Sequence, residues 1–198
     1  VATLEIGGDK PVYPDLLKTL DQAMTGNYRT HIVSAGSGEA PLLWVMVTGE
    51  KPLTAEQKQR ILGHVQSGGY LLVDVVSGNA KWGEVAMAAI RSLSTDISAR
   101  PMRTLHPIYT GKIPGTQGFD SRGGPLRKAL TSELIEQGRN EFTVLYLKGA
   151  EFGVFSHYDL SSGLTYNQFP GCRGLLPDEA RELVLNGVLA AMQHEKQK

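Results

Sequence analysis

Two uninterrupted apolar runs, each followed by a helical pattern, constrain the fold of this chain more than any other feature. They lie at residues 42–48 and 69–75. Apolar runs without polar alternation are typical of strands that are buried on both faces, as in a parallel sheet covered by helices. Helices that connect such strands form right-handed crossovers. The sequence therefore predicts an α/β protein, a three-layer sandwich with a central, mostly parallel sheet.

Other elements are predicted from spacing, turn residues and caps. Thr54 and Gln57 form a capping-box pattern, and Gly68 is placed to end that helix in the left-handed conformation. Further strands are predicted at 2–6, 30–34, 142–147 and 151–156, and helices begin near 14, 54, 80 and 177. The last two strands are separated by a short turn, so they are expected to form an antiparallel hairpin near the C-terminus.

The segment 104–140 differs from the rest of the chain. It holds many glycines, several prolines and one short helical pattern at about 126–136. A stretch of this length inside a compact domain is usually a functional loop or a lid. The chain has 198 residues, of which 41% are apolar and 20% charged, as expected for a single globular domain. We therefore predict one α/β domain over residues 1–198, with an irregular insert or lid at about 104–140.

Charge and composition exclude several classes of function. The formal net charge is zero, which gives no electrostatic footprint for nucleic acid. No apolar run is long enough to span a bilayer, so membrane contact is expected only through an anchor upstream of Val1. The single cysteine, Cys172, rules out an internal disulfide framework and a cysteine-based metal cage.

Several motifs of catalysis and cofactor binding are missing. The chain has no G-x-S-x-G elbow, no G-x-G-x-x-G, no P-loop and no H-E-x-x-H pair. Cys172 lies in a Gly/Pro-rich loop without an activating context, so no catalytic role is expected for it. No cofactor and no metal site are predicted.

Polar residues cluster where the predicted strands end. Ligands of open α/β sheets bind beyond the carboxyl ends of the strands, and this rule selects the candidates. The candidate catalytic residues are Asp74, His106, His157 and Asp159, and the candidate ligand-binding residues are Asp74, Ser77, Tyr109, Arg122 and Tyr158. Two histidines and two carboxylates could serve as an acid–base pair or as metal ligands, but their spacing establishes neither.

Structural roles are open for each of these residues. Asp74 is equally well explained as a cap for loop or helix amides. His106 could anchor a turn before Pro107, and His157 with Asp159 could form a hydrogen-bonded loop pair. The remaining histidines, at positions 31, 64 and 194, are expected on the surface, and the tryptophans and tyrosines are expected to pack in the core.

The order of motifs resembles a known bacterial family. The motifs are Leu-Thr-Ala-Glu-Gln at 53–57, Gly-Gly-Tyr-Leu-Leu-Val-Asp at 68–74, His-Pro-Ile-Tyr at 106–109, Ser-His-Tyr-Asp-Leu at 156–160, Gly163, and Asn186 in the closing helix. Over nearly the whole chain they resemble the domain of unknown function 4159 family. That family is grouped with class I glutamine-amidotransferase-like, flavodoxin-like folds.

The resemblance implies a fold and a setting rather than a reaction. Family members usually continue the strand with a second acidic residue, where this chain has Val75, and often carry a tryptophan near position 164, where this chain has Leu164. The nucleophile of an amidotransferase would fall just after the strand, at 74–77, where there is no cysteine. The resemblance thus argues against glutamine hydrolysis, and it suggests an exported, periplasmic or cell-envelope protein.

Three functions remain as hypotheses. The first is a non-catalytic binding or scaffold module of the bacterial cell envelope, with an unknown protein or small-molecule partner. The second is a hydrolase that uses Asp/His acid–base or metal chemistry, which requires His106 and His157 within about 10 Å of Asp74. The third is a sensor of a small, sugar-like ligand, with the segment 104–140 as its lid.

Overall fold

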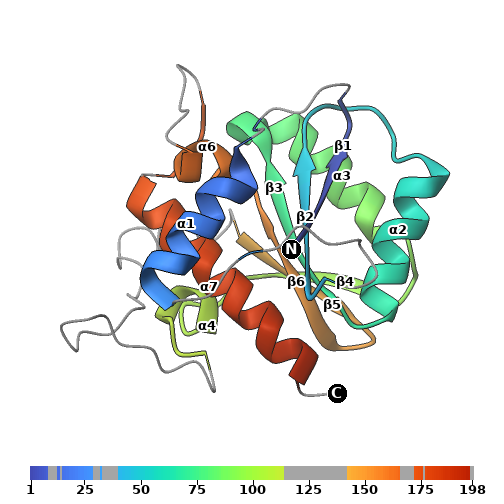
Figure 1. Ribbon diagram of the computed structural model, residues 1–198. Coiled ribbons are helices and arrows are strands. Elements are labelled where there is room, and N and C mark those ends of the chain that lie inside the picture. Colours follow the sequence, from blue (N-terminus) through green and yellow to red (C-terminus); the bar gives the residue numbers. More distant parts are fainter. Residues whose placement is uncertain are drawn as a thin grey trace.

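The computed structural model describes residues 1–8, 13, 15–28, 32, 40–113, 142–165, 172–175 and 177–196. These residues form a six-stranded mixed sheet with helices on both faces, a flavodoxin-like three-layer sandwich (Figure 1). The predicted α/β class is therefore confirmed.

The sheet has the strand order β1-β2-β3-β6-β5-β4. The strands are β1 (Ala2–Ile6), β2 (Leu42–Val47), β3 (Tyr70–Val75), β4 (Ile97–Pro101), β5 (Phe142–Leu147) and β6 (Ala150–Ser156). The pairs β1–β2, β2–β3 and β3–β6 are parallel. Strand β5 is antiparallel to both of its neighbours, β6 and β4. The predicted hairpin is β5–β6, and Lys148 and Gly149 form its turn with positive φ values of 51° and 84°.

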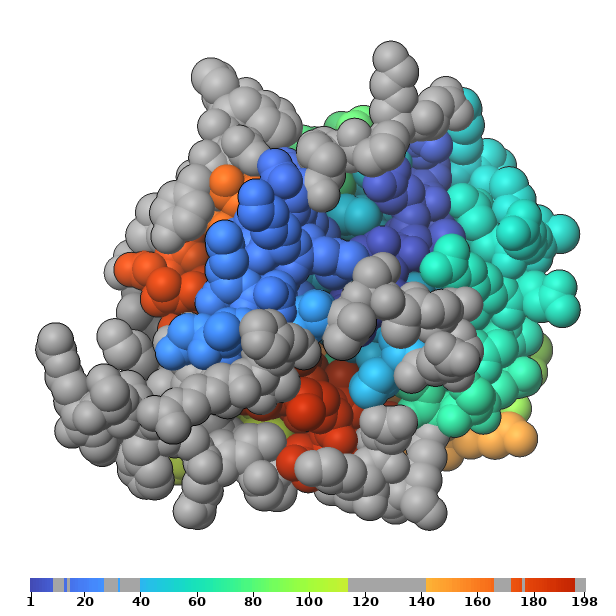
Figure 2. Space-filling model, viewed as in Figure 1, coloured from blue at the N-terminus to red at the C-terminus, as the bar shows by residue number. Residues whose placement is uncertain are grey.

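The helices divide between the two faces of the sheet. They are α1 (Leu16–Tyr28), α2 (Ala55–Gln66), α3 (Ala80–Arg91), α4 (Pro107–Thr110), α6 (Leu160–Thr165) and α7 (Pro177–Lys196), with a 3-10 turn η1 (Val76–Gly78). One face carries α1, α4, α6 and α7, and the other carries α2 and α3 (Figure 1). Figure 2 shows α1 in blue across the first face, beside α6 and α7 in orange and red.

Alternation along β3 separates two cores and fixes the direction of Asp74. Tyr70 and Leu72 pack in the core under α1, α6 and α7, whereas Leu71 and Val73 pack under α2 and α3. Because successive side chains of a strand point to opposite faces, Asp74 shares the side of Leu72 and faces α6.

Local signals in the sequence explain the start and the end of α2. The Thr54 hydroxyl accepts the Gln57 amide at 3.1 Å, and the Gln57 side chain accepts the Thr54 amide at 2.9 Å, so the predicted capping box is formed. Gly68 follows the helix with φ 90°, the left-handed conformation that was expected there.

Several predictions need correction or lie beyond the described residues. The sequence patterns did not predict β4, α4 and α6. His64, expected on the surface, is 3% exposed and its Nε2 lies 3.1 Å from the Tyr70 carbonyl. The predicted strand at 30–34 lies outside the described residues except for Ile32, as do the helix at 126–136 and the part of the predicted lid from 114 to 140. In the described part of the chain, no helix has the length and apolar character to cross a membrane.

Candidate functional site

Asp74 lies near the carboxyl end of β3 and is completely buried. Its Oδ1 accepts the backbone N–H of Leu160 at 2.8 Å, and its Oδ2 accepts the N–H of Ser161 at 3.0 Å. The same Oδ2 also accepts the Ser161 hydroxyl and, at 3.3 Å, the indole N–H of Trp44. The two backbone donors belong to the first turn of α6, where N–H groups have no acceptor within the helix. The carboxylate therefore tethers α6 to the sheet.

Asp159 caps the same helix from the residue before it, and it too is completely buried. Its Oδ1 accepts the N–H of Ser162 at 2.8 Å, the usual bond of an N-cap aspartate. Its Oδ2 accepts the Tyr13 hydroxyl at 2.8 Å and the N–H of Ser77 at 2.6 Å. Asp159 thus links α6 to the turn after β3 and to the residues that precede α1.

The two buried carboxylates raise the proton affinity of the site. Burial, followed by the negative charge of Asp159, raises the pKa of Asp74 to about 7, although hydrogen bonds from Ser161 and Leu160 act in the opposite direction. Burial and the neighbouring Asp159 also raise the pKa of the Tyr13 phenol, which stays protonated and donates. A carboxyl group that titrates near neutral pH is suited to acid–base chemistry. Here, however, neither carboxylate contacts solvent.

Ser77 occupies the sharp turn between β3 and α3 in a strained conformation. Its φ and ψ are 59° and −1°, in the left-handed region that residues other than glycine rarely adopt. The Asp159 carboxylate accepts its N–H, and its carbonyl accepts the N–H of Arg173 at 2.9 Å. A strained strand-to-helix turn is also where α/β hydrolases place a nucleophile. Within the described ranges, the Ser77 hydroxyl forms no hydrogen bond to a histidine.

The segment 172–175 covers this turn. A Cβ on Gly78 would lie 2.4 Å from the Cβ of Arg173, so the two backbones are in direct contact. The N–H of Asp159 donates to the Arg173 carbonyl at 3.0 Å, and Asp159 forms a parallel bridge with Gly174. The crevice beyond β3 is therefore filled by the chain itself.

Two contacts at the site were missed by the sequence reasoning. Cys172, given no role, directs its thiol at the Asp159 carboxylate at 3.6 Å and lies 3.4 Å from the Ser162 hydroxyl. Tyr13 reaches Asp159 across 146 residues of sequence. No local pattern signals either contact, because both depend on how distant segments meet around α6.

His157 follows β6 but lies on the opposite side of the sheet from Asp74. Its ring contacts Phe155 at a centroid distance of 4.7 Å, and a Cβ on Gly83 of α3 would lie 2.8 Å from its Nδ1. Tyr158, the next residue, lies between the Phe142 ring at 5.5 Å and the Arg173 guanidinium at 5.7 Å.

His106 lies at the amino ends of the strands. Its Nε2 is 3.2 Å from Glu151 Oε2, and Glu151 Oε1 accepts the Tyr70 hydroxyl at 2.6 Å. Tyr70 begins β3, so it stands about 13 Å along the strand from Asp74. Of the four catalytic candidates, only Asp74 and Asp159 therefore lie together, and neither histidine joins them.

The ligand-binding candidates are divided in the same way. Asp74 and Ser77 are joined through the network of Asp159, whereas Tyr109 is fully buried and packs edge-on against Phe142 with ring centroids 5.8 Å apart. Arg122 lies outside the described residues.

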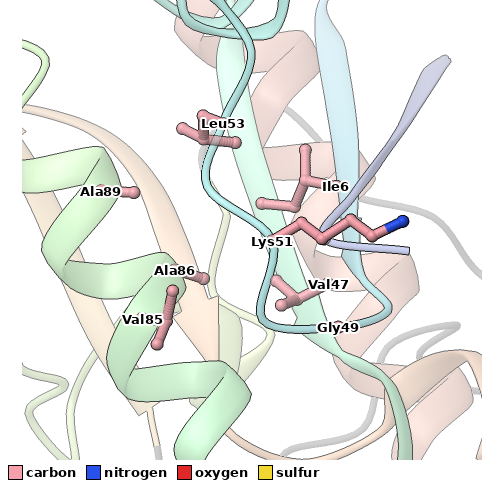
Figure 3. Close-up of a pocket in the computed structure, with 9 residues that line it drawn as sticks. Ile6, Val47, Gly49, Lys51, Leu53, Val85, Ala86 and Ala89 are labelled. Carbon is pink, nitrogen blue, oxygen red and sulfur yellow. The ribbon is translucent and has the colours of Figure 1, made fainter. Parts of the chain in front are cut away.

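A small hollow opens on the opposite face of the sheet from Asp74, between the carboxyl ends of β1 and β2 and the helix α3 (Figure 3). Its lining is mainly apolar, from Ile6, Val47, Leu53 and Ala86, with Lys51 on the loop between β2 and α2. It has room for about one water molecule, far less than a typical ligand pocket. Across the described segments, no three His, Cys, Asp or Glu side chains are grouped to hold a metal ion.

Comparisons with known proteins add no relative. No model of a known protein family matches the chain, and no curated protein matches it significantly in sequence. The resemblance to the domain of unknown function 4159 family stays a prediction from its motifs.

Proposed function

We propose that the chain is a non-catalytic binding or scaffold module of the bacterial cell envelope. One observation carries the non-catalytic part: each oxygen of Asp74 and Asp159 accepts hydrogen bonds from the chain's own groups. These are the only two carboxylates among the candidate residues at this edge of the sheet, and both accept hydrogen bonds that hold α6 in place.

The position of α6 supports the same conclusion. A ligand in an open α/β sheet binds in the crevice beyond the strands. In this chain the first turn of α6 and the segment 172–175 lie in that crevice, and Asp74 and Asp159 are 0% exposed. A substrate would have to displace α6 and break its cap before reaching either carboxylate.

The envelope setting and the partner rest on different support. Export and a periplasmic or envelope location follow from the motif resemblance alone. We propose a protein or small-molecule partner because the polar groups at the strand ends bond to the chain itself and are not available for catalysis.

A hydrolase is the second candidate, favoured by two observations. The pKa of Asp74 near 7 suits a general acid or base, and Ser77 has the backbone strain found at nucleophile turns. This function requires α6 to move away from Asp74, and it leaves His106 without a role.

A substrate panel separates the two candidates. Purified wild type, Ser77→Ala and Asp74→Asn are tested at pH 7 on ester, peptide, glycoside and phosphate-ester substrates, with folding checked by circular dichroism. A binding module gives no turnover above buffer with any of them. Turnover by the wild type that the folded Ser77→Ala or Asp74→Asn variant loses would overturn the proposal. The exposed Asp96→Asn is the matched control for the aspartate.

A further inference from the structure

The turn at 103–106 presents the one large apolar side chain that is strongly exposed in the described part of the chain. Leu105 is 84% exposed, between the exposed residues Thr104 and Pro107. An isolated exposed leucine has no meaning by itself. Two further properties of this turn, its anchoring and its charge, distinguish it from an ordinary loop.

The turn is anchored at both ends. On one side Met102 is 2% exposed, and its N–H donates to the Phe142 carbonyl at 2.9 Å. On the other side His106 Nε2 lies 3.2 Å from Glu151 Oε2 of β6, and within the turn the His106 N–H donates to the Arg103 carbonyl at 2.9 Å. Leu105 is thus held in place before any partner arrives, which lowers the entropy lost on binding.

The His106 ring strengthens this anchor through both nitrogens. Nδ1 accepts the N–H of Ile108 at 3.3 Å, so the ring proton is on Nε2 and is directed at Glu151. Burial alone would raise the pKa of Glu151, but hydrogen bonds from His106 and Tyr70 outweigh it and hold that pKa below its ordinary value. The negative charge of Glu151 is therefore stabilised by its bonds to His106 and Tyr70, and these bonds hold the turn against β3 and β6.

The charged side chains of the segment that carries the turn are all basic, although the Glu151 carboxylate lies against His106. Residues 97–113 contain Arg100, Arg103 and Lys112 and no aspartate or glutamate. The Arg100 guanidinium lies over the Tyr146 ring, 5.5 Å from its centroid, which restrains it. Arginine is enriched in protein interfaces. A surface that complements this turn needs an apolar recess and carboxylates at its border.

Other occupants fit less well. The hollow of Figure 3 on a second copy does not fit Leu105, because it holds about one water and is flanked by Lys51, which has the wrong charge. A small molecule needs a concave site, and this turn is convex. Nucleic acid needs a broad basic surface, and the net charge of the chain is zero.

We infer that the turn 103–106, which carries Leu105 and Arg103 and follows Arg100 of β4, docks a folded protein partner through an apolar pocket bordered by carboxylates. This inference rests on the proposed binding function and names the surface that serves it.

Photo-crosslinking and affinity measurements test the inference. The full chain carries benzoylphenylalanine at position 105, or at the exposed Glu84 of α3 as a control, in cells of the organism that encodes it. We expect a heterologous protein to crosslink from position 105 and not from position 84. Its affinity for the purified chain is then measured by calorimetry. Leu105→Ser and Arg103→Glu should each weaken binding at least tenfold, Glu84→Gln should leave it within twofold, and added salt should weaken it further.

The outcomes separate this inference from the proposed function. Crosslinking only to a second copy, to nucleic acid or to nothing at position 105, or a partner whose affinity is unchanged by Leu105→Ser, overturns the docking surface. A partner captured from position 84 alone also overturns it, yet agrees with a binding module. Catalytic turnover in the substrate panel overturns the proposed function, whatever the crosslinks show.

Discussion

Asp74 Oδ1 accepts the backbone N–H of Leu160 at 2.8 Å, across 86 residues of chain. The contact joins the end of a buried strand to the first residue of α6. This helix is only six residues long and has two serines and a glycine, which are poor helix formers. Its stability therefore depends on tertiary hydrogen bonds to Asp74 and on its own N-cap, Asp159.

Removing the Asp74 carboxylate should destabilise the fold severely. Asp74→Ala leaves the buried donors of Leu160, Ser161 and Trp44 without an acceptor, and each such group costs about 1–3 kcal/mol. We expect the free energy of unfolding, measured in urea, to fall by at least about 3 kcal/mol. Asp96→Ala, on an exposed side chain, should change it by less than about 0.5 kcal/mol. A loss below about 1 kcal/mol for Asp74→Ala would contradict the tether.

The pH dependence of stability reports on the same carboxyl group. Burial and the charge of Asp159 raise the pKa of Asp74 to about 7, so the folded protein holds this proton more tightly than the unfolded chain. The stability that it contributes is complete below about pH 4 and is lost as the pH rises to about 7. We therefore expect the wild type to lose more unfolding free energy between pH 4 and pH 7 than Asp74→Asn does. If the two proteins lose the same unfolding free energy between pH 4 and pH 7, the pKa of Asp74 is not raised in the folded state.

Glycine at position 77 should relieve backbone strain. Ser77 and Lys148 are the two non-glycine residues with positive φ in the described ranges, at 59° and 51°. The left-handed conformation costs about 1–2 kcal/mol for such residues, and the greater freedom of unfolded glycine offsets about half of this. Ser77→Gly and Lys148→Gly should each stabilise the protein by about 0.5 kcal/mol in thermal denaturation. If Ser77→Gly destabilises the protein while Lys148→Gly stabilises it, the Ser77 side chain makes a stabilising contact that outweighs the strain.

The contact between α6 and α7 should tolerate no side chain at position 163. A Cβ on Gly163 would lie 2.5 Å from the Cβ of Ala180 and 2.9 Å from the Leu175 carbonyl oxygen. Gly163→Ala should therefore cost about 1–3 kcal/mol by overpacking. Gly26→Ala, at a helical position with nothing within 4 Å, should stabilise by up to about 1 kcal/mol. If the two substitutions had the same effect, the close packing of α6 on α7 would be disproved.

The regular elements could be predicted because their signals are local. The apolar runs of β2 and β3 and the capping box at Thr54 and Gln57 depend on near neighbours in sequence. The strand β4 was missed because it is only five residues long, carries a single large apolar side chain, Ile97, and ends in Arg100 and Pro101. The helix α6 was missed because it is short and rich in serine and glycine, and because the distant Asp74 supplies acceptors that its local N-cap, Asp159, does not.

The site was only half predictable for the same reason. Alternation and the strand ends selected Asp74, Ser77 and Asp159, which do form one network. The same rule could not show that His106 lies at the opposite edge, since it follows β4, an unpredicted strand. His64 was misplaced because its burial depends on Gly69, where a Cβ would lie 2.1 Å from the His64 ring.

Amide hydrogen exchange tests the central claim most directly, because the claim requires α6 to occupy both carboxylates in the native protein. The N–H groups of Leu160 and Ser161 bond to Asp74, and that of Ser162 bonds to Asp159. At pH 7 we predict that these three amides exchange as slowly as the core amides of β3, through global unfolding. Exchange as fast as in an open loop, with β3 still protected, would show that α6 leaves the carboxylates free for a substrate and would contradict the account.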